Sequence, residues 1–441
     1  MGGGLMQLVA YGAQDVYLTG DPQITFFKVV YRRHTNFAIE AIQQSINGYA
    51  DFGRRVTCTV SRSGDLIGNI FVQLTLPTLS VGTITTGAVA NLNEAAWTNA
   101  IGHVLLKEIQ LEIGGQKIDT QYGIWLEIWT ELTSTAEKIQ GYNQMVGRVA
   151  PDQTPQAISA ATQQTLQIPL MFWFCRNPGL ALPLISLQYH DTKIIIDFEE
   201  AIKCVVGLQV GGARSTDNFT TLASPPAFIG ANIYVDYYYL DTNERRKFAS
   251  MSHEYLIPQL QFSKPEQVRL DKSNHKQPIN LVHPVKELIW VFRRSDNYTV
   301  GTQYNDWYNF SAAPAGSTSA SPFYVNLLQS AKIIMNGNDR FSIRIANYFR
   351  LTQPWQYHTR VPNKQIYVYS FALRPEEHQP SGTCNFSRID NSQLEYNIVT
   401  DDPLTPGQGW ADPSFSQFML FALNYNVLRV MSGMGGLAYS N

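Results

Sequence analysis

The residues best suited to acid–base chemistry stand in two short acidic clusters. Glu376, Glu377 and His378 are consecutive, and so are Asp401 and Asp402. A glycosidase needs two carboxylates held roughly 5–9.5 Å apart, one acting as acid and the other as base or nucleophile. Both clusters lie in proline-containing sequence that is typical of surface loops. We therefore interpret them as solvated surface carboxylates and expect no catalytic pair.

The spacing of the other polar residues does not indicate a metal site or a nucleotide site. The eight histidines are dispersed, and no two stand in the His-x-His or His-x-x-x-His spacing that would suit a metal site. No Walker loop, Rossmann glycine motif, nucleophile elbow or His-Glu-x-x-His motif occurs. Residues 433–438 are glycine-rich, but they lack the strand–loop–helix setting of a phosphate site. We interpret them as a flexible or closely packed tail, and we expect no enzymatic activity, no metal and no cofactor.

Four Asn-x-Ser/Thr sequons are the candidate modification sites: Asn218, Asn297, Asn309 and Asn385. Their use requires a secretory route, and the start of the chain lacks the positive region and apolar core of a signal peptide. Asn297 and Asn309 flank an aromatic stretch that contains Trp307 and Tyr308, so this pair is the first to examine.

Composition favours a protein that packs against other proteins. The chain has 441 residues and a net charge of −2, and only 15% of its residues are charged, compared with about 25% in ordinary soluble domains. A near-neutral surface neither holds nucleic acid by phosphate neutralisation nor opposes self-association. We interpret the basic clusters at residues 32–34 and 245–247 as solvated segments. The four cysteines show no Cys-x-x-Cys spacing, which indicates reduced thiols in a cytoplasmic setting.

A β-hairpin pattern occurs twice, and the rest of the chain is organised around it. Residues 109–113 alternate apolar and polar before Gly114-Gly115, and residues 331–335 do so before Asn336-Gly337. Both dipeptides suit a tight turn with positive φ. The second pattern follows the first at an offset of 222 (337 minus 115), and Asp65-Leu66-Ile67 is echoed by Glu287-Leu288-Ile289 at the same offset. We infer a tandem duplication.

Short β-rich segments separated by turns predict two sandwiches. We expect strands at 37–46, 55–60, 66–76, 168–174, 184–189, 193–198 and 233–240, long loops at 78–100 and 134–165, and an amphipathic helix at 124–132. A helix-like stretch near 345–349 follows the second hairpin. Further along the chain, residues 174–178 are similar to residues 371–375, at an offset of 197 (371 minus 174). The difference of 25 between the two offsets (222 minus 197) predicts an insertion in the first copy, within 134–165. The predicted division is an arm at 1–25 with a short helix, a first β-sandwich domain at 26–245 and a second at 246–441, and the eight-stranded jelly roll is one sandwich of this kind. The segment at 241–253 should connect the two domains.

With these motifs in hand, the chain resembles the major capsid proteins of nucleocytoplasmic large DNA viruses, most closely the algal phycodnavirus type. The matching stretches are residues 3–40, 61–70, 109–119, 283–292 and 424–441, including IQLEIGGQKID and NYNVLRVMSGMGGLAYSN. They extend from one end of the chain to the other.

The resemblance implies an all-β, double jelly-roll protein that forms a homotrimeric, pseudo-hexagonal capsomer of an icosahedral capsid. It further implies neighbouring capsomers, minor capsid and penton proteins as partners, an inner viral membrane close to the arm, covalent glycans and no direct contact with nucleic acid. Assembly would occur in the host cytoplasm. The alternative is a carbohydrate-binding or carbohydrate-active jelly roll, a monomer or dimer that uses Trp307 and Tyr308 to bind free sugar.

Overall fold

The computed structural model describes residues 3–79, 84–86, 92–148, 158–159, 163–209, 219–222, 224–294, 305–312, 325–400 and 416–439. The chain divides into a small N-terminal unit, Met1–Phe37, and a large unit, Ala38–Asn441. Within the described residues, no helix combines the length and the apolar character needed to cross a bilayer.

The N-terminal unit is an arm without a core of its own. It contains two short helices, α1 (Gly3–Val9) and α2 (Val16–Thr19), and neither helix has a buried residue. Gly20 follows α2 with an extended backbone, and residues 21–36 form no further regular element. The short helix expected within residues 1–25 is therefore present.

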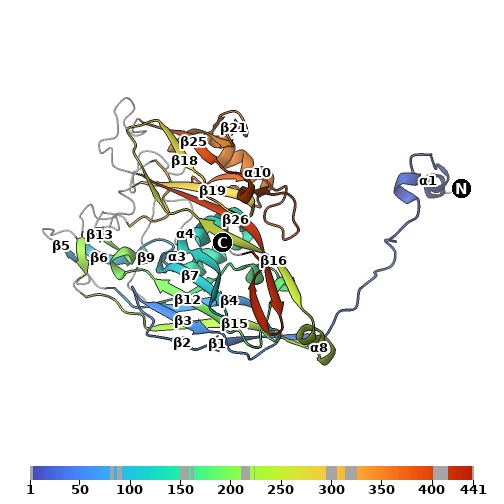
Figure 1. The fold of residues 1–441 in the computed structure, drawn as a ribbon, viewed down its shortest axis with the longest axis horizontal. Coiled ribbons are helices and arrows are strands. Elements are labelled where there is room, and N and C mark those ends of the chain that lie inside the picture. Colours follow the sequence, from blue (N-terminus) through green and yellow to red (C-terminus); the bar gives the residue numbers. More distant parts are fainter. Residues whose placement is uncertain are drawn as a thin grey trace. The chain divides into compact units, whose positions relative to one another are not determined.

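The first half of the large unit is a sandwich of two five-stranded sheets (Figure 1). One sheet has the order β1 (Phe37–Gln44), β15 (Gly230–Leu240), β4 (Leu66–Leu76), β10 (Gln164–Pro169), with β11 (Leu182–Pro183) also paired to β4. The other has the order β2 (Ile46–Asn47), β3 (Arg55–Thr59), β12 (Thr192–Phe198), β7 (Leu106–Ile113), β8 (Gln116–Tyr122). Two small sheets join β13 (Val205–Gln209), β6 (Leu92–Trp97) and β9 (Ile158–Ser159), and β14 (Phe219–Leu222) with β5 (Ile84–Thr86).

The second half repeats this arrangement. One sheet has the order β16 (His253–Phe262), β26 (Ser416–Met431), β19 (Pro284–Arg294), β23 (Tyr367–Ser370), with β17 (Glu266–Val268), β24 (Cys384–Asn385) and β27 (Met434–Leu437) paired at its margins. The other has the order β18 (Asn274–Pro278), β25 (Ser392–Ile398), β20 (Leu328–Met335), β21 (Asn338–Asp339), with β22 (Arg344–Ile345) also on β20. The main strands of the two halves occur in the same spatial order, as a duplicated jelly roll requires.

Short helices lie in the connections. In the first half these are α3 (Ile101–Leu105), α4 (Gly123–Thr133), α5 (Ala136–Val146), α6 (Trp173–Arg176), η2 (Pro178–Leu180) and α7 (Ala201–Cys204). The helix α8 (Thr242–Ser250) connects the halves, and the second half contains η4 (Tyr348–Thr352), α10 (Gln353–Tyr357) and η5 (Phe386–Arg388).

The apolar core explains how the halves are joined. Leu288, Trp290 and Phe292 of β19 belong to a core made of second-half residues alone. The alternate residues Ile289 and Val291 belong to the larger core of the first half. Because successive strand residues point to opposite faces, the sheet containing β19 is buried on both sides, by its own sandwich and by the first half.

Several local expectations were wrong. The segment 78–100 contains β5 and β6, and 134–165 contains α5, β9 and the start of β10, so neither is a structureless loop. The apolar run 168–174 ends its strand at Pro169 and continues into α6, because an apolar run alone does not distinguish strand from buried helix. The segment 184–189 forms turns, and the connection at 241–253 is mostly the helix α8, capped by Asp241.

Candidate functional site

A buried network of charged side chains lies where the first half meets the second. Its central element is α4, which follows the first hairpin. Trp125, Ile128, Trp129 and Leu132 recur at helical spacing and are buried, as the periodicity predicts. Glu127 and Glu131 of the same helix are also buried, with at most 1% of either side chain exposed. Two buried carboxylates on one helix require partners.

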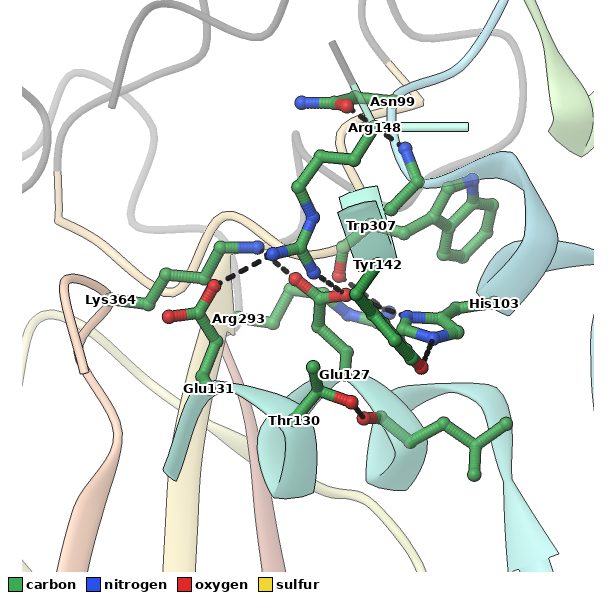
Figure 2. A network of polar contacts seen from close by, with 12 residues as sticks. Asn99, His103, Glu127, Thr130, Glu131, Tyr142, Arg148, Arg293, Trp307 and Lys364 are labelled. Atoms are coloured by element: carbon green, nitrogen blue, oxygen red, sulfur yellow. Dashed lines mark hydrogen bonds and ion pairs between the residues drawn. The ribbon is translucent and has the colours of Figure 1, made fainter. Parts of the chain in front are cut away.

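Glu127 is the centre of this network (Figure 2). Its carboxylate accepts hydrogen bonds from Nδ1 of His103 at 2.7 Å and from the guanidinium of Arg148. It also accepts one from Nζ of Lys364 at 2.5 Å, and Lys364 belongs to the second half. The bond to Lys364 therefore joins the two sandwiches directly.

Glu131 makes a second connection one helical turn later. Arg148 donates to its Oε1 at 2.8 Å, and Arg360 of the second half lies 3.1 Å from its Oε2. Arg148 thus bridges both carboxylates of α4, and each carboxylate also pairs with one cation of the second half. Such charge-assisted bonds are the strongest and most directional of protein hydrogen bonds.

The pKa shifts show which of these groups carry charge. Burial acts to raise the pKa of Glu127, but Arg148 and Lys364 outweigh it and hold that pKa well below its ordinary value. Burial lowers the pKa of His103, so its imidazole is neutral at pH 7. A neutral His103 that donates through Nδ1 to Glu127 must accept at Nε2, and the hydroxyl of Tyr142 lies 2.7 Å from that atom.

Tyr142, His103 and Glu127 are joined by hydrogen bonds in the order hydroxyl, imidazole, carboxylate, as in a catalytic relay. Only this order is shared with such a relay. The side chains of His103 and Glu127 are fully buried, and that of Arg148 is 2% exposed. A general base must reach a proton on its substrate, and no substrate reaches a group enclosed in this way. The arrangement instead fixes the orientation of α4 against the second half.

The hairpin identified in the sequence forms the other part of this junction. The carbonyl of Ile118 in β8 accepts from Nε2 of Gln259, and Oδ1 of Asp119 accepts from the backbone N–H of Leu260 at 3.1 Å. The rings of Tyr122 and Phe262 lie 4.9 Å apart. A cavity of about 370 Å³ between β8 and β16 is lined largely by polar groups of both halves. Burial raises the pKa of Asp119 to about 6.

A second buried cluster lies within the second half. His358 contacts Oε2 of Glu287 through Nε2 and Oε1 of Glu376 through Nδ1, each at 2.9 Å. Burial opposes the charged imidazole, but the two carboxylates outweigh it and raise the pKa of His358 to about 9. The backbone N–H of Thr359 also donates to Glu376 at 2.9 Å. Our interpretation of Glu376 as a solvated carboxylate is therefore wrong, because it holds a protonated histidine.

The other acidic residues lie elsewhere. Glu377 is an exposed partner of Arg374 at 3.1 Å, and burial and the nearby Lys286 lower the pKa of His378. Asp401 and Asp402 lie outside the described residues. Within the residues that the structure describes, no three His, Cys, Asp or Glu side chains gather as a metal ion would require.

Two of the four candidate glycosylation sites lie within the described residues. Asn218 and Asn297 lie outside the described residues. Asn385 is exposed, and its Oδ1 accepts from the N–H of Ser387 at 3.1 Å. Asn309 is half-buried, and its Oδ1 accepts from the N–H of Ser311 at 3.0 Å.

The aromatic residues proposed for sugar binding serve packing. Tyr308 is only 7% exposed and belongs to the core of the first half. Trp307 donates from Nε1 to the carbonyl of Lys203 at 2.8 Å, and the guanidinium of Arg293 lies 5.2 Å from its ring centre. These contacts connect the loop 305–312 to α7 of the first half, and they leave neither ring free as an open platform for a sugar.

The glycine-rich tail is closely packed. Met434–Leu437 forms β27, which pairs with β26 and completes a hairpin through Ser432 and Gly433, both at positive φ. The imidazole of His190 contacts the carbonyl of Gly435 at 2.9 Å, and Oε1 of Gln116 accepts from Leu437 N–H at 3.2 Å. The tail therefore contributes to the junction between the halves.

Comparison with known proteins agrees with this two-part architecture. Residues 25–241 match the family described as major capsid protein N-terminus, and residues 244–436 match the large eukaryotic DNA virus major capsid protein family. Major capsid proteins of Pyramimonas orientalis virus and Phaeocystis pouchetii virus are 47% and 43% identical to the chain, with full coverage of both proteins in each case.

Solved structures show the same fold. A chain of the PBCV-1 virus capsid superimposes with a TM-score of 0.76 at 35% identity, covering 95% of this chain and 100% of that one. The Faustovirus major capsid protein has a TM-score of 0.70 at 14% identity, covering 96% and 94% of the two chains, and it supports the fold alone. The double jelly roll and the virion role expected from the resemblance are confirmed. The chain belongs to the major capsid proteins of large eukaryotic DNA viruses, which form the viral shell.

Proposed function

We propose that the chain assembles as a homotrimer whose six jelly rolls form a pseudo-hexagonal capsomer, and that these capsomers tile the faces of an icosahedral capsid. The observation that carries this proposal is the pair of sandwiches with one strand order, held together by the buried ion pairs of Glu127 and Glu131. A rigid chain with two similar lobes approximates six-fold packing when three copies close around an axis.

The proposed division is an arm at residues 1–25, a first domain at 26–245 and a second at 246–441. No described strand pairs across residue 245, which supports this boundary. The arm exposes many apolar side chains, including Leu8, Val9 and Tyr17. Exposed apolar chain of this kind suits a docking role, and we assign it to minor capsid proteins at the inner side of the shell, near the viral membrane.

Other parts of the proposal follow from chemistry. The four cysteines are free thiols, which supports assembly in the host cytoplasm. Penton proteins and neighbouring capsomers are the expected lateral partners, with no role for nucleic acid or for catalysis.

Covalent glycans are proposed at Asn218, Asn297, Asn309 or Asn385. Peptide mass spectrometry of virions tests each asparagine, and unmodified asparagine at all four removes this part.

Light scattering coupled to size exclusion tests the trimer. The expected particle has three times the 49.6 kDa mass of one chain. A stable monomer of 49.6 kDa would refute the capsomer and would favour the alternative of a carbohydrate-binding jelly roll. The burial of Tyr308 already weighs against that alternative, because its proposed sugar platform is internal.

A further inference from the structure

A helical segment follows each hairpin at the same distance in the sequence. Adding the hairpin offset of 222 to Gly123–Thr133, which is α4, gives the range 345–355, which includes η4 and the start of α10. The same addition places Asn347, Leu351 and Trp355 at the positions of Trp125, Trp129 and Thr133. The two segments are therefore counterparts in the sequence repeat, and the environments of their residues can be compared.

In the first half, this helical face is buried inside the chain. Trp125 and Trp129 stack at 5.4 Å, and Trp125 lies 5.7 Å from Phe421 on β26 of the second half. The surface that receives them is the outer face of the second-half sheet, where Ile289, Val291 and Phe421 are at most 1% exposed. A helix of one sandwich thus covers a sheet of the next.

In the second half, the residues of this helical face that the structure describes are exposed. Trp355 is 75% exposed and Leu351 is 38% exposed, although these residues lie four apart and therefore share one side of the helix. Ile345 and Ile343 just before it are 67% and 53% exposed. We call Ile343, Ile345, Leu351 and Trp355 the donor patch. An exposed tryptophan close in sequence to exposed aliphatic side chains is typical of an interaction surface.

A matching receiver is also present among the described residues, and its outer face is partly exposed. The counterpart of the second-half sheet is the sheet β1-β15-β4-β10, which has the same strand order. On its outer face Tyr234 pairs with Phe71 and Asn232 with Gln73 across β15 and β4, and these side chains are half-buried. Gln43 of β1 donates to Asn232 at 2.8 Å, which places Gln43 on this face. Ile39 shares it by strand alternation and is 56% exposed.

We propose that the donor patch of one chain docks on the outer face of the β1-β15-β4-β10 sheet of a second copy, and so repeats between chains the contact that α4 makes within the chain. This inference rests on the proposed trimer and specifies its interface. The contact is head-to-tail, with one donor and one receiver on each chain, and three such contacts close a ring of six jelly rolls.

Single substitutions on the donor patch give the first test. Trp355→Glu in the full chain is expected to convert the trimer into a monomer in light scattering, through a rise of roughly thirtyfold or more in the dissociation constant, the scale of a hot-spot tryptophan. Met251→Glu is the matched control, because Met251 is 62% exposed and lies outside both surfaces. Met251→Glu should remain trimeric. Circular dichroism should show the wild-type fold for both, since both positions are exposed.

Mixing two variants tests the head-to-tail geometry. Ile39→Glu blocks the receiver and should also give a monomer. A mixture of Trp355→Glu with Ile39→Glu retains one intact donor and one intact receiver, so it should give a heterodimer with twice the mass of one chain and no trimer, whereas neither variant dimerises alone. A Trp355→Glu variant that remains trimeric, or a mixture that does not associate, overturns this interface. A wild-type chain that is itself monomeric refutes the trimer instead, so the two failures are distinguishable.

Discussion

Replacement of Glu127 by glutamine tests whether the buried ion network stabilises the junction between the sandwiches. The glutamine keeps the shape of the side chain and removes the charge that faces Arg148 and Lys364. Lys364 is 15% exposed and can take up water, but the side chain of Arg148 is 2% exposed and cannot. Removing one partner of a buried pair costs about 3–5 kcal/mol.

The expected cost can be converted into a melting temperature. An unfolding entropy of about 2.1 cal/mol/K per residue, applied to the 404 residues of Ala38–Asn441, gives about 0.85 kcal/mol/K if the large unit melts as one. Glu127→Gln should then melt about 4–6 °C below the wild type in calorimetry at one fixed protein concentration. Glu254→Gln is the control, because Glu254 pairs with Arg429 at 2.8 Å on the surface, with both side chains more than half exposed. It should shift the melting temperature by less than about 1 °C.

The pH dependence gives an independent check. The pKa of Glu127 is lowered by folding, so its contribution is fully present above the ordinary value of 4.5 and is lost as the pH falls below it. The difference between the wild type and Glu127→Gln should therefore be constant from pH 8 to about 5 and should shrink in stronger acid. Equal melting of the two proteins at pH 7, or an equal loss in Glu254→Gln, would refute the assignment of Glu127 as a structural centre.

Two further perturbations address other parts of the large unit. His358→Gln removes a group whose pKa is raised to about 9 by Glu287 and Glu376. The wild type should therefore exceed the variant in free energy of unfolding by about 3 kcal/mol below pH 6.5, and this difference should disappear by about pH 9 in paired melting curves. A pH-independent difference would contradict it. Gly337→Ala should cost about 1 kcal/mol, since its φ is +78° in open space, whereas Gly114→Ala should cost clearly more, since its Cβ would lie 2.3 Å from Nδ1 of His190. Equal denaturation midpoints for the two glycine variants would show that the His190 contact has no weight.

Local sequence signals were sufficient for the fold. The hairpins at Gly114-Gly115 and Asn336-Gly337 are set by turn chemistry and by alternation, and both occur where the pattern placed them, with positive φ at all four residues. The repeat offset predicted a tandem duplication, and the structure contains two sandwiches with the same strand order. Segments with weak periodicity were assigned less well. The helix α5 was missed because its sequence is polar and only Ile139, Asn143 and Val146 are buried.

The junction network could not be read from spacing, because its members are far apart in the chain. Glu127 and Lys364 are separated by 237 residues, and His103 and Glu127 by 24. One signal was available. Glu127 and Glu131 lie on a helix whose other residues are almost all apolar, so burial of the whole helix implied buried carboxylates that needed cations. Which lysine or arginine would supply the charge depends on how the two halves pack, and packing between halves leaves no local pattern.

The segment 134–165, where the sequence predicts an insertion in the first copy, contains part of the junction within the chain. It includes α5, Tyr142 and Arg148, the cation that bridges Glu127 and Glu131. In the second copy, Phe349 and Gln353 occupy the positions of Glu127 and Glu131 at the hairpin offset of 222. The second copy therefore lacks both the acids and the bridging arginine, and Phe349 and Gln353 are buried. The apolar side chains that it exposes, Leu351 and Trp355, lie at the positions of Trp129 and Thr133. The ionic junction forms once, during folding, so its charged groups are desolvated once. An apolar contact buries no charge, so two chains that meet do not have to desolvate charged groups. On the interface proposed above, the segment 134–165 thus distinguishes the ionic junction within the chain from the apolar contact proposed between chains.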